Sequence, residues 1–176
     1  SIADRIAVNS AASVAYDSHN LPSGEVFTAP VVESVVGTVT FDVPMTIENR
    51  TVRDVRLTFE DGEVVDFAAV QGEGAIADVL ETDDGARYLG ELGIGMNRGI
   101  DRPTGQIIFD EKMAGTIHLA LGRAYEACIP EGEEGNQSAA HADLITDMRQ
   151  SGTHLEVDGE VIQRDGVFRW EDGFEG

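Results

Sequence analysis

The chain has 176 residues, and its 33 Asp and Glu residues outnumber its 12 Lys and Arg residues, which gives a net charge of −21 at pH 7. Nucleic acids and anionic membranes bind clustered cations, so we expect neither as a partner. The acidic residues are scattered along the chain, and Lys112 is the only lysine. At molar salt the Debye length is about 3 Å, so dispersed carboxylates hardly repel one another. We therefore predict a halophilic source, in which most acidic residues serve solubility alone.

The length fits a single domain with its own hydrophobic core. Cys128 is the only cysteine, so no disulfide can form within the chain, as expected for a reducing cytoplasm. The sequence contains no run of about 18 apolar residues that would predict a membrane span. Its N-terminus also lacks the cationic start and apolar stretch of a signal peptide. We therefore expect a cytoplasmic protein.

The first half of the chain is dominated by strand patterns. Residues 1–19 are only weakly patterned, and we expect a linker or the remnant of a missing element there. Residues 35–43 are rich in β-branched side chains, and residues 51–60 alternate between apolar and polar positions. Asp61-Gly62 then leads into residues 63–67, and an Asp-Gly between two such runs is a strong hairpin signal. We predict a meander of three or four antiparallel strands.

Short helices are expected in the middle of the chain, over residues 72–80 and 83–89, the second with Thr82 or Asp83 as its N-cap. The glycine-rich stretch that follows Glu91 predicts a loop. Further short strands are expected at residues 106–109, 116–121 and 141–148, and a second Asp-Gly hairpin at residues 155–162. The predicted fold class is therefore α+β: a β-rich domain with an antiparallel, barrel-like sheet and a few short helices.

Histidines in strand patterns are the first candidates for chemistry. His141 and Asp143 are two residues apart in a predicted strand, so their side chains point to the same face. Imidazole and carboxylate together suit zinc, cobalt or manganese, although two polar residues on a strand can simply face water. His118 lies between apolar neighbours, where it is either a metal ligand or a histidine packed in the core.

Acidic residues in apolar surroundings are the second group of candidates. Glu91 lies inside an apolar, Gly-flanked run, and Glu25 lies at the start of an apolar strand. A charge in such a place is costly unless it is paired or coordinated. The alternatives are a charge at a helix end for Glu91 and a turn carboxylate for Glu25. Glu111 can be a catalytic base or a loop acid, and Tyr125 an oxyanion donor or a core aromatic.

Four segments in order carry a resemblance to a known family: Asn20–Pro30, Leu89–Gly95, Asp110–Glu111 followed by His118–Tyr125, and His141–Asp143. Together they resemble peptidase family M29, the thermophilic aminopeptidases, from about residue 15 to residue 170. The resemblance implies a metal-dependent aminopeptidase that acts on peptides with two divalent ions, zinc, cobalt or manganese. The metal ligands that it implies are Glu25, Glu91, His118, Tyr125, His141 and Asp143.

The resemblance also implies catalytic roles and a domain organisation. Glu111 would act as a catalytic acid and base, although its spacing to His118 is longer than is usual in the family, and Tyr125 would stabilise the oxyanion or ligate a metal. Residues 20–176 would form the metal-binding catalytic domain, whereas the family's N-terminal α/β domain is missing and 1–19 would be its linker or remnant. The family forms dimers, so we expect a homodimer for a full-length enzyme.

Two other classes of function compete with the peptidase. One is a non-catalytic, acidic β-rich binding or structural domain whose histidines are packed in the core. The other is a sugar- or ion-binding β-barrel module, which would need exposed aromatic side chains. Trp170 and three tyrosines are the residues available for that purpose.

Overall fold

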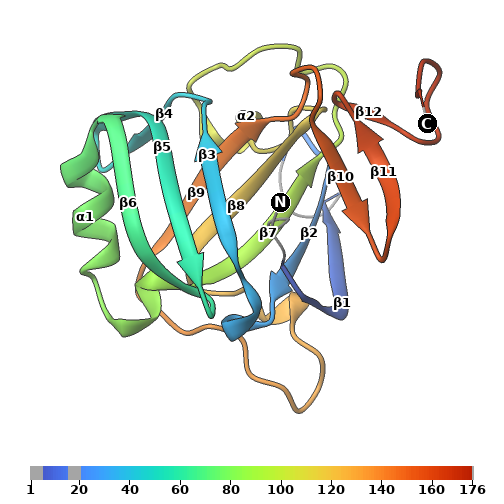
Figure 1. Ribbon diagram of the computed structural model, residues 1–176. Coiled ribbons are helices and arrows are strands. Elements are labelled where there is room, and N and C mark those ends of the chain that lie inside the picture. The colour runs from blue at the N-terminus through green and yellow to red at the C-terminus, as the bar shows by residue number, and fades with distance from the viewer. Residues whose placement is uncertain (1–5, 16–20, 176) are drawn as a thin grey trace.

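The computed structural model describes residues 6–15 and 21–175, which form three antiparallel sheets with a few short helices (Figure 1). The β-rich α+β prediction is therefore confirmed. The pairings of the described strands do not return to their starting strand, so they do not confirm the barrel-like closure that we predicted. None of the helices within these ranges is long and apolar enough to cross a membrane.

A five-stranded sheet forms the back of the molecule in Figure 1, with the strand order β1-β2-β7-β8-β9. Its strands are β1 (Val8–Ala15), β2 (Glu25–Pro30), β7 (Leu89–Gly95), β8 (Thr116–Gly122) and β9 (His141–Asp147). One face carries leucines from β7, β8 and β9 that are buried in the main core: Leu89, Leu119, Leu121 and Leu144. The alternation of side chains along a strand leaves the opposite face for polar residues.

A four-stranded sheet packs against this leucine face and completes the main core. It contains β3 (Gly37–Phe41), β4 (Met45–Ile47), β5 (Arg50–Glu60) and β6 (Glu63–Gln71). Asp61 and Gly62 join β5 to β6 with φ angles of 47° and 84°. Positive φ at both central residues is typical of the tight hairpin turn that matches the twist of the strands. The predicted antiparallel strands and the hairpin between β5 and β6 are confirmed, although β3 and β4 both pair with β5 rather than with each other.

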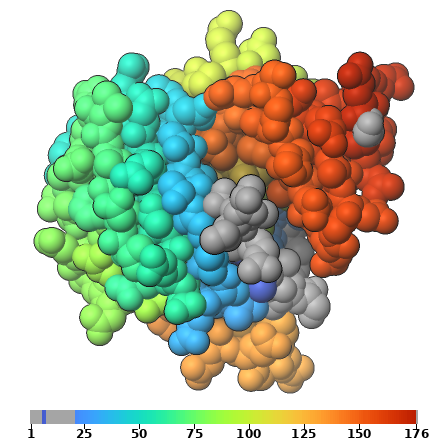
Figure 2. All heavy atoms as spheres, viewed as in Figure 1, coloured from blue at the N-terminus to red at the C-terminus, as the bar shows by residue number. Residues whose placement is uncertain are grey.

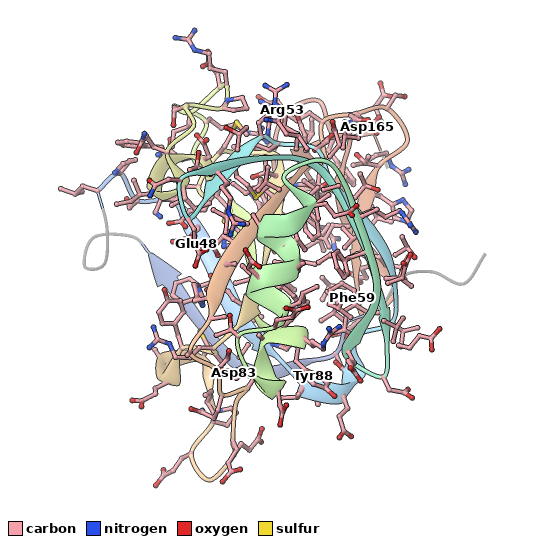
Figure 3. The ribbon with its side chains drawn as sticks, turned by 90° about the vertical axis from the view of Figure 1, so that its left-hand side faces the viewer. Glu48, Arg53, Phe59, Asp83, Tyr88 and Asp165 are labelled. Atoms are coloured by element: carbon pink, nitrogen blue, oxygen red, sulfur yellow. The ribbon has the colours of Figure 1, made fainter. Side chains whose placement is uncertain are left out.

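Helix α1 (Glu73–Leu80) lies at the side of the molecule, between the two sheets (Figure 3). Its apolar face, which includes Ile76 and Leu80, is buried in the core. The predicted second helix is a short 3-10 helix, η2 (Asp84–Arg87), and two further 3-10 turns are η1 (Val32–Ser34) and η3 (Glu126–Cys128).

A small C-terminal sheet contains β10 (His154–Val157), β11 (Glu160–Arg164) and β12 (Val167–Phe168). The predicted Asp-Gly hairpin is confirmed, because Asp158 and Gly159 connect β10 to β11 with φ angles of 51° and 85°. This sheet forms one side of the molecule and the four-stranded sheet the other (Figure 2).

Two local predictions are wrong. Residues 92–95, where we predicted the start of a loop, belong to strand β7 (Leu89–Gly95), because this segment pairs with β2 on one side and β8 on the other. Residues 107–110 form the short helix α2 (Ile107–Asp110) rather than a strand, because the amide of Asp110 bonds to the Gln106 carbonyl. A short apolar run fits either type of element. Residues 8–15, in the predicted linker, form strand β1 at the edge of the sheet.

Candidate metal centre

The polar face of the five-stranded sheet collects five predicted metal ligands. In the strand register, Glu91 lies opposite Ala120 and Gly93 opposite His118, while Ala120 and Gly122 lie opposite Asp143 and His141. Glu25 lies opposite Gly95 on the other side of β7. Directly opposed residues point to the same face of a sheet. The fold therefore brings together side chains from four strands: Glu25, Glu91, His118, His141 and Asp143.

The glycines of β7 provide the space for this cluster. A Cβ atom on Gly93 would lie 2.0 Å from Cε1 of His118, and one on Gly95 would lie 2.1 Å from the Met113 carbonyl oxygen. A non-bonded carbon contact is favourable at about 3.5–4.0 Å, so no larger residue fits at either position. Two of the glycines that suggested a loop are thus required in β7, Gly93 because the His118 ring lies over it and Gly95 because of the Met113 carbonyl.

One part of the cluster, which we call the buried half, consists of Glu25 and His118. The Nε2 atom of His118 lies 3.1 Å from Oε1 of Glu91 and 3.7 Å from Oε2 of Glu25. The His118 and Glu25 side chains are only 1% and 7% exposed. Among the described residues, Oε2 of Glu25 has no hydrogen-bond partner. Burying a carboxylate oxygen without a partner costs free energy, and a bound cation would provide that partner.

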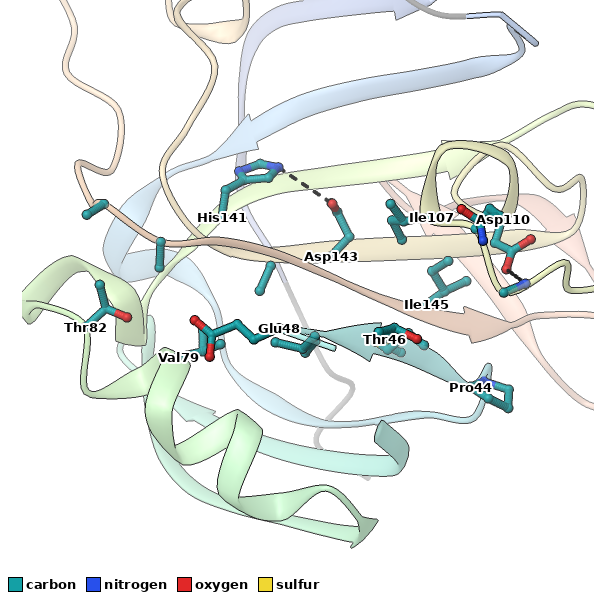
Figure 4. Close-up of a pocket in the computed structure, with 17 residues that line it drawn as sticks. Pro44, Thr46, Glu48, Val79, Thr82, Ile107, Asp110, His141, Asp143 and Ile145 are labelled. Atoms are coloured by element: carbon teal, nitrogen blue, oxygen red, sulfur yellow. Dashed lines mark hydrogen bonds and ion pairs between the residues drawn. The ribbon is translucent and has the colours of Figure 1, made fainter. Parts of the chain in front are cut away.

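The other part, the open half, consists of His141 and Asp143. The Nε2 atom of His141 lies 3.6 Å from Oε2 of Glu91 and 3.7 Å from Oδ1 of Asp143 (Figure 4). The Nδ1 atom of the same ring lies 2.9 Å from the carbonyl oxygen of Arg123. A proton on Nδ1 would donate to that carbonyl and leave the Nε2 lone pair facing the carboxylates. This is the orientation that metal-bound histidines commonly adopt.

Glu91 lies between the two halves. Two sets of ligand atoms lie within 4.8 Å of one another, Glu25 with Glu91 and His118, and Glu91 with His141 and Asp143. Imidazole nitrogen with carboxylate oxygen is the donor set of zinc and similar divalent ions. Each set therefore offers donors that fit a divalent cation, and Glu91 is common to both sets.

The charges of the cluster perturb its protonation. Burial lowers the pKa of His118, but the hydrogen bond to Glu91 and the negative charges of Asp143, Glu91 and Glu25 outweigh it and raise the pKa to about 9. Burial raises the pKa of the Asp143 carboxyl group, although the two histidines oppose this shift. Burial and neighbouring charges shift the pKa values of clustered carboxylates and histidines. Such shifts are typical of both metal sites and catalytic sites.

Glu111 and Tyr125, the predicted catalytic residues, lie beside the two halves. Burial raises the pKa of Glu111, and the charges of Glu25 and Asp143 add to this effect. Burial also raises the pKa of the Tyr125 hydroxyl, together with the charges of Glu91 and Asp143. The ring of Tyr125 packs edge-on against His141, with 5.0 Å between the ring centroids.

Lys112 is the site residue that the sequence analysis did not identify. Its side chain is fully buried, and its Nζ atom lies 3.1 Å from Oε1 of Glu25 and donates to Oε1 of Glu111. The buried cation thus joins the predicted base to a predicted ligand. A signal was available, because Lys112 is the only lysine in the chain and directly follows Glu111.

Comparison with known proteins supports the resemblance. The family model for thermophilic metalloproteases, M29, matches residues 7–168. Aminopeptidase 2 of Geobacillus stearothermophilus is 36% identical over 162 residues, which cover 85% of this chain and 39% of that protein. Aminopeptidase T of Thermus aquaticus is 36% identical over 160 residues, which cover 84% of this chain and 37% of that protein. The chain thus spans less than half the length of these relatives.

Solved structures share the fold. Wild-type AmpT from Thermus thermophilus superposes with a TM-score of 0.71 at 30% identity, covering 90% of this chain and 43% of that one. The 2,5-dihydroxypyridine dioxygenase of Pseudomonas putida gives a TM-score of 0.61 at 16% identity, covering 86% of this chain and 45% of that one. At that identity the second likeness concerns the fold alone.

Proposed function

Because the chain belongs to the M29 family of thermophilic metalloproteases, we propose that it is the metal-binding catalytic domain of an aminopeptidase. The enzyme would release N-terminal amino acids from peptides by hydrolysis at a dinuclear metal site. The observation that carries this proposal is the position of Glu91, whose two carboxylate oxygens face His118 and His141 at 3.1 Å and 3.6 Å. One carboxylate between two donor groups is suited to bridging two cations.

Two divalent ions, zinc, cobalt or manganese, would be held by the two halves. Glu25 and His118 would bind one ion, His141 and Asp143 the other, and Glu91 would bridge them, with Tyr125 as a further oxygen ligand. When bound, such a pair supplies a Lewis acid for the scissile carbonyl and lowers the pKa of a water molecule towards neutrality. Arg123 contributes through its carbonyl oxygen, which orients the His141 ring.

Glu111 would move the protons of the reaction. Its raised pKa brings the carboxyl group closer to neutral pH, where a general base can also return the proton as an acid. Glu111 would accept a proton from the attacking water and deliver it to the leaving amine. The Lys112 ammonium group, bonded to Oε1 of Glu111, would fix the orientation of that carboxylate.

In the alternative to a ligand role, Tyr125 would act on the substrate oxygen. Its raised pKa keeps the hydroxyl protonated, so it remains a hydrogen-bond donor at neutral and mildly alkaline pH. A donor held at the position of the developing oxyanion stabilises the transition state.

The wider setting also belongs to the proposal. The substrates would be peptides with a free N-terminus, and the working enzyme would contain the N-terminal domain of the family and form a homodimer. We propose a cytoplasmic location and a source adapted to high salt, in line with the net charge of −21.

The decisive test is Glu91→Gln in the full-length enzyme. The amide would remove the bridging charge, so we expect the variant to lose both metal ions and the cleavage of an aminoacyl chromogenic substrate. Metal content is measured by atomic spectroscopy after gel filtration, with the exposed Glu81→Gln as the control. Retention of two tightly bound ions by Glu91→Gln would refute the bridging role.

A calorimetric titration of the chain with zinc or cobalt addresses the competing class of function. We expect saturable binding of two ions per chain. An absence of saturable binding would instead support a non-catalytic, acidic β-rich domain.

A further inference from the structure

A groove runs along the outer edge of β9 and opens into the open half of the metal site (Figure 4). We call it the β9 groove; it lies between β9, β4, the end of α1 and the start of α2, and its volume is about 600 Å³. His141 and Asp143 line the groove as well as the metal site. A volume of this size holds a small ligand or a few residues of a peptide. Anything bound there would meet the two ligands of the open half.

The groove exists because two edge strands diverge. At one end the amide of Val43 donates to the carbonyl oxygen of Ile145 at 3.3 Å, and the amide of Asp147 donates to the Asp42 carboxylate at 2.8 Å. The chain then turns away into β4, whose partner is β5 and not β9. From Asp143 back to His141, β9 is thus the edge strand of its sheet within the part of the chain that the structure describes.

The backbone groups of Asp143 and His141 face this groove. In an antiparallel strand the N–H and C=O groups of alternate residues point to opposite edges. The backbone groups of Ile145 and Asp147 point away from β8, towards Asp42 and Val43. Those of Asp143 and His141, two and four residues earlier than Ile145, therefore point the same way, and no described strand pairs with them. Such an edge can accept an extended peptide as one more strand.

The walls of the groove favour a particular kind of peptide. Met45 and Ile47 of β4, Val79 of α1 and Ile145 of β9 provide an apolar lining. The Glu48 carboxylate lies on the same groove, with Asp143 at its inner end. Glu48 is paired with Arg50 at 2.9 Å, and Asp143 is a proposed metal ligand. In the metal-free chain this distribution favours uncharged apolar side chains and, at Asp143, a positively charged amine, and it disfavours acidic peptides.

We propose that the β9 groove binds the substrate peptide as an additional strand on β9, with its free amine towards Asp143 and an apolar side chain against Met45, Ile47 and Val79. This inference rests on the proposed function, for which it supplies the substrate class. Hydrogen bonds between the backbone of Asp143 and the peptide backbone would contribute affinity that does not depend on the peptide sequence. The apolar wall would then select among side chains.

The test uses tri-leucine with a free amine, titrated calorimetrically into the chelator-treated chain and again into the zinc-loaded chain. Thr46 is the exposed residue of β4 and lines the groove, so Thr46→Trp would fill it. Thr40→Trp is the matched control, because Thr40 is exposed on the neighbouring β3 and does not line the groove. We expect tri-leucine to bind the original chain and Thr40→Trp equally, and Thr46→Trp roughly tenfold more weakly or not at all.

Two further probes test the chemistry of the contact. Tri-leucine methylated on its central peptide nitrogen cannot donate a hydrogen bond to β9, and we expect it to bind roughly tenfold more weakly. Tri-glutamate should not bind. Equal affinity of the two tri-leucines, or of the two tryptophan variants, would overturn the proposal, as would a failure of tri-leucine to bind the original chain. If the chain binds no zinc yet discriminates among these peptides, the peptide-binding role of the groove is supported and the dinuclear metal function is refuted.

Discussion

The two halves of the candidate metal site use the same types of ligand in different surroundings. In the buried half, the His118 and Glu25 side chains are 1% and 7% exposed, whereas in the open half those of His141 and Asp143 are 18% and 15% exposed. The buried half lies under the Lys112 ammonium group, and the open half faces the β9 groove. Protein contacts thus surround one half, while the other leaves room for a ligand.

This difference implies that the buried half contributes mainly to the stability of the chain and the open half to the access of ligands. A buried carboxylate needs a partner in the folded chain, so the buried half depends on Lys112 even when no metal is bound. The open half is in contact with the solvent-accessible groove, so its charges are better screened. We therefore expect changes to the buried half to affect folding and metal binding together. Changes to the open half should affect mainly ligand binding.

Lys112→Met should have the largest effect on stability. Removing one partner of a buried ion pair leaves the other charge uncompensated, so we expect a loss of about 3–5 kcal/mol in the free energy of unfolding of the metal-free chain. Zinc should recover part of the loss by neutralising Glu25. Urea denaturation with and without zinc measures both effects.

The control is Arg56→Met, which breaks an ion pair to Asp66 between side chains that are 47% and 58% exposed. It should cost less than about 1 kcal/mol. Equal losses in the two variants would contradict the role of Lys112.

Gly93→Ala should disrupt the buried half by steric conflict. The new Cβ would lie 2.0 Å from Cε1 of the His118 ring, which is fully buried. Overpacking of this kind costs about 1–3 kcal/mol, and the displaced ring should weaken one of the two proposed metal sites. Urea denaturation and zinc stoichiometry measure the two results. Gly74→Ala is the control, since among the described residues no atom outside the adjacent helix backbone lies within 4 Å of the new Cβ in helix α1, and we expect a gain of about 0.5–1 kcal/mol there.

The pH dependence of the metal-free chain should report the buried half. The pKa of His118 is raised from 6.5 to about 9 in the folded chain, so its protonated form contributes stability that is fully present below about pH 6.5. The contribution is lost as the pH rises through about 9. We expect the free energy of unfolding to fall over this window, and His118→Asn to remove that slope. His154→Asn, a change at an exposed histidine of β10, should leave it intact.

Much of the polar side-chain cluster could be predicted from the sequence, while its role as a metal site stays a prediction. Glu91 and His118 are polar residues in apolar runs, and such residues need partners. His141 and Asp143 share a strand face through their spacing alone. The distance between the segments could not be predicted locally, because it depends on the pairing of β7 with β2 and β8.

The wrong predictions also arise from contacts between segments that are distant in the sequence. Glycine disfavours strands in general, yet Gly93 and Gly95 lie in β7 because the His118 ring and the Met113 carbonyl occupy the space of a side chain. The apolar run within residues 106–109 resembled a strand, but the Asp110 carboxylate accepts hydrogen bonds from the amides of Thr104 and Gly105, which fixes the preceding turn. Tertiary contacts override local preference at both places. Lys112 was missed because a buried ion pair leaves no periodic pattern.

Asp83→Asn should have the smallest effect, confined to the open half. The Asp83 carboxylate accepts hydrogen bonds from the Ala139 amide and the Ser138 hydroxyl, both at 2.7 Å, just before β9 begins. These bonds, the Ala139 bond foremost, lower the pKa of Asp83 below its ordinary value of 3.8. The contact therefore stabilises the chain above that value and is lost as the pH falls through the lowered pKa. We expect the amide of Ala139 to exchange hydrogen faster in Asp83→Asn, with no change around His118. Asp84→Asn, an exposed neighbour, should change neither region, and faster exchange around His118 in Asp83→Asn would show that the two halves are coupled.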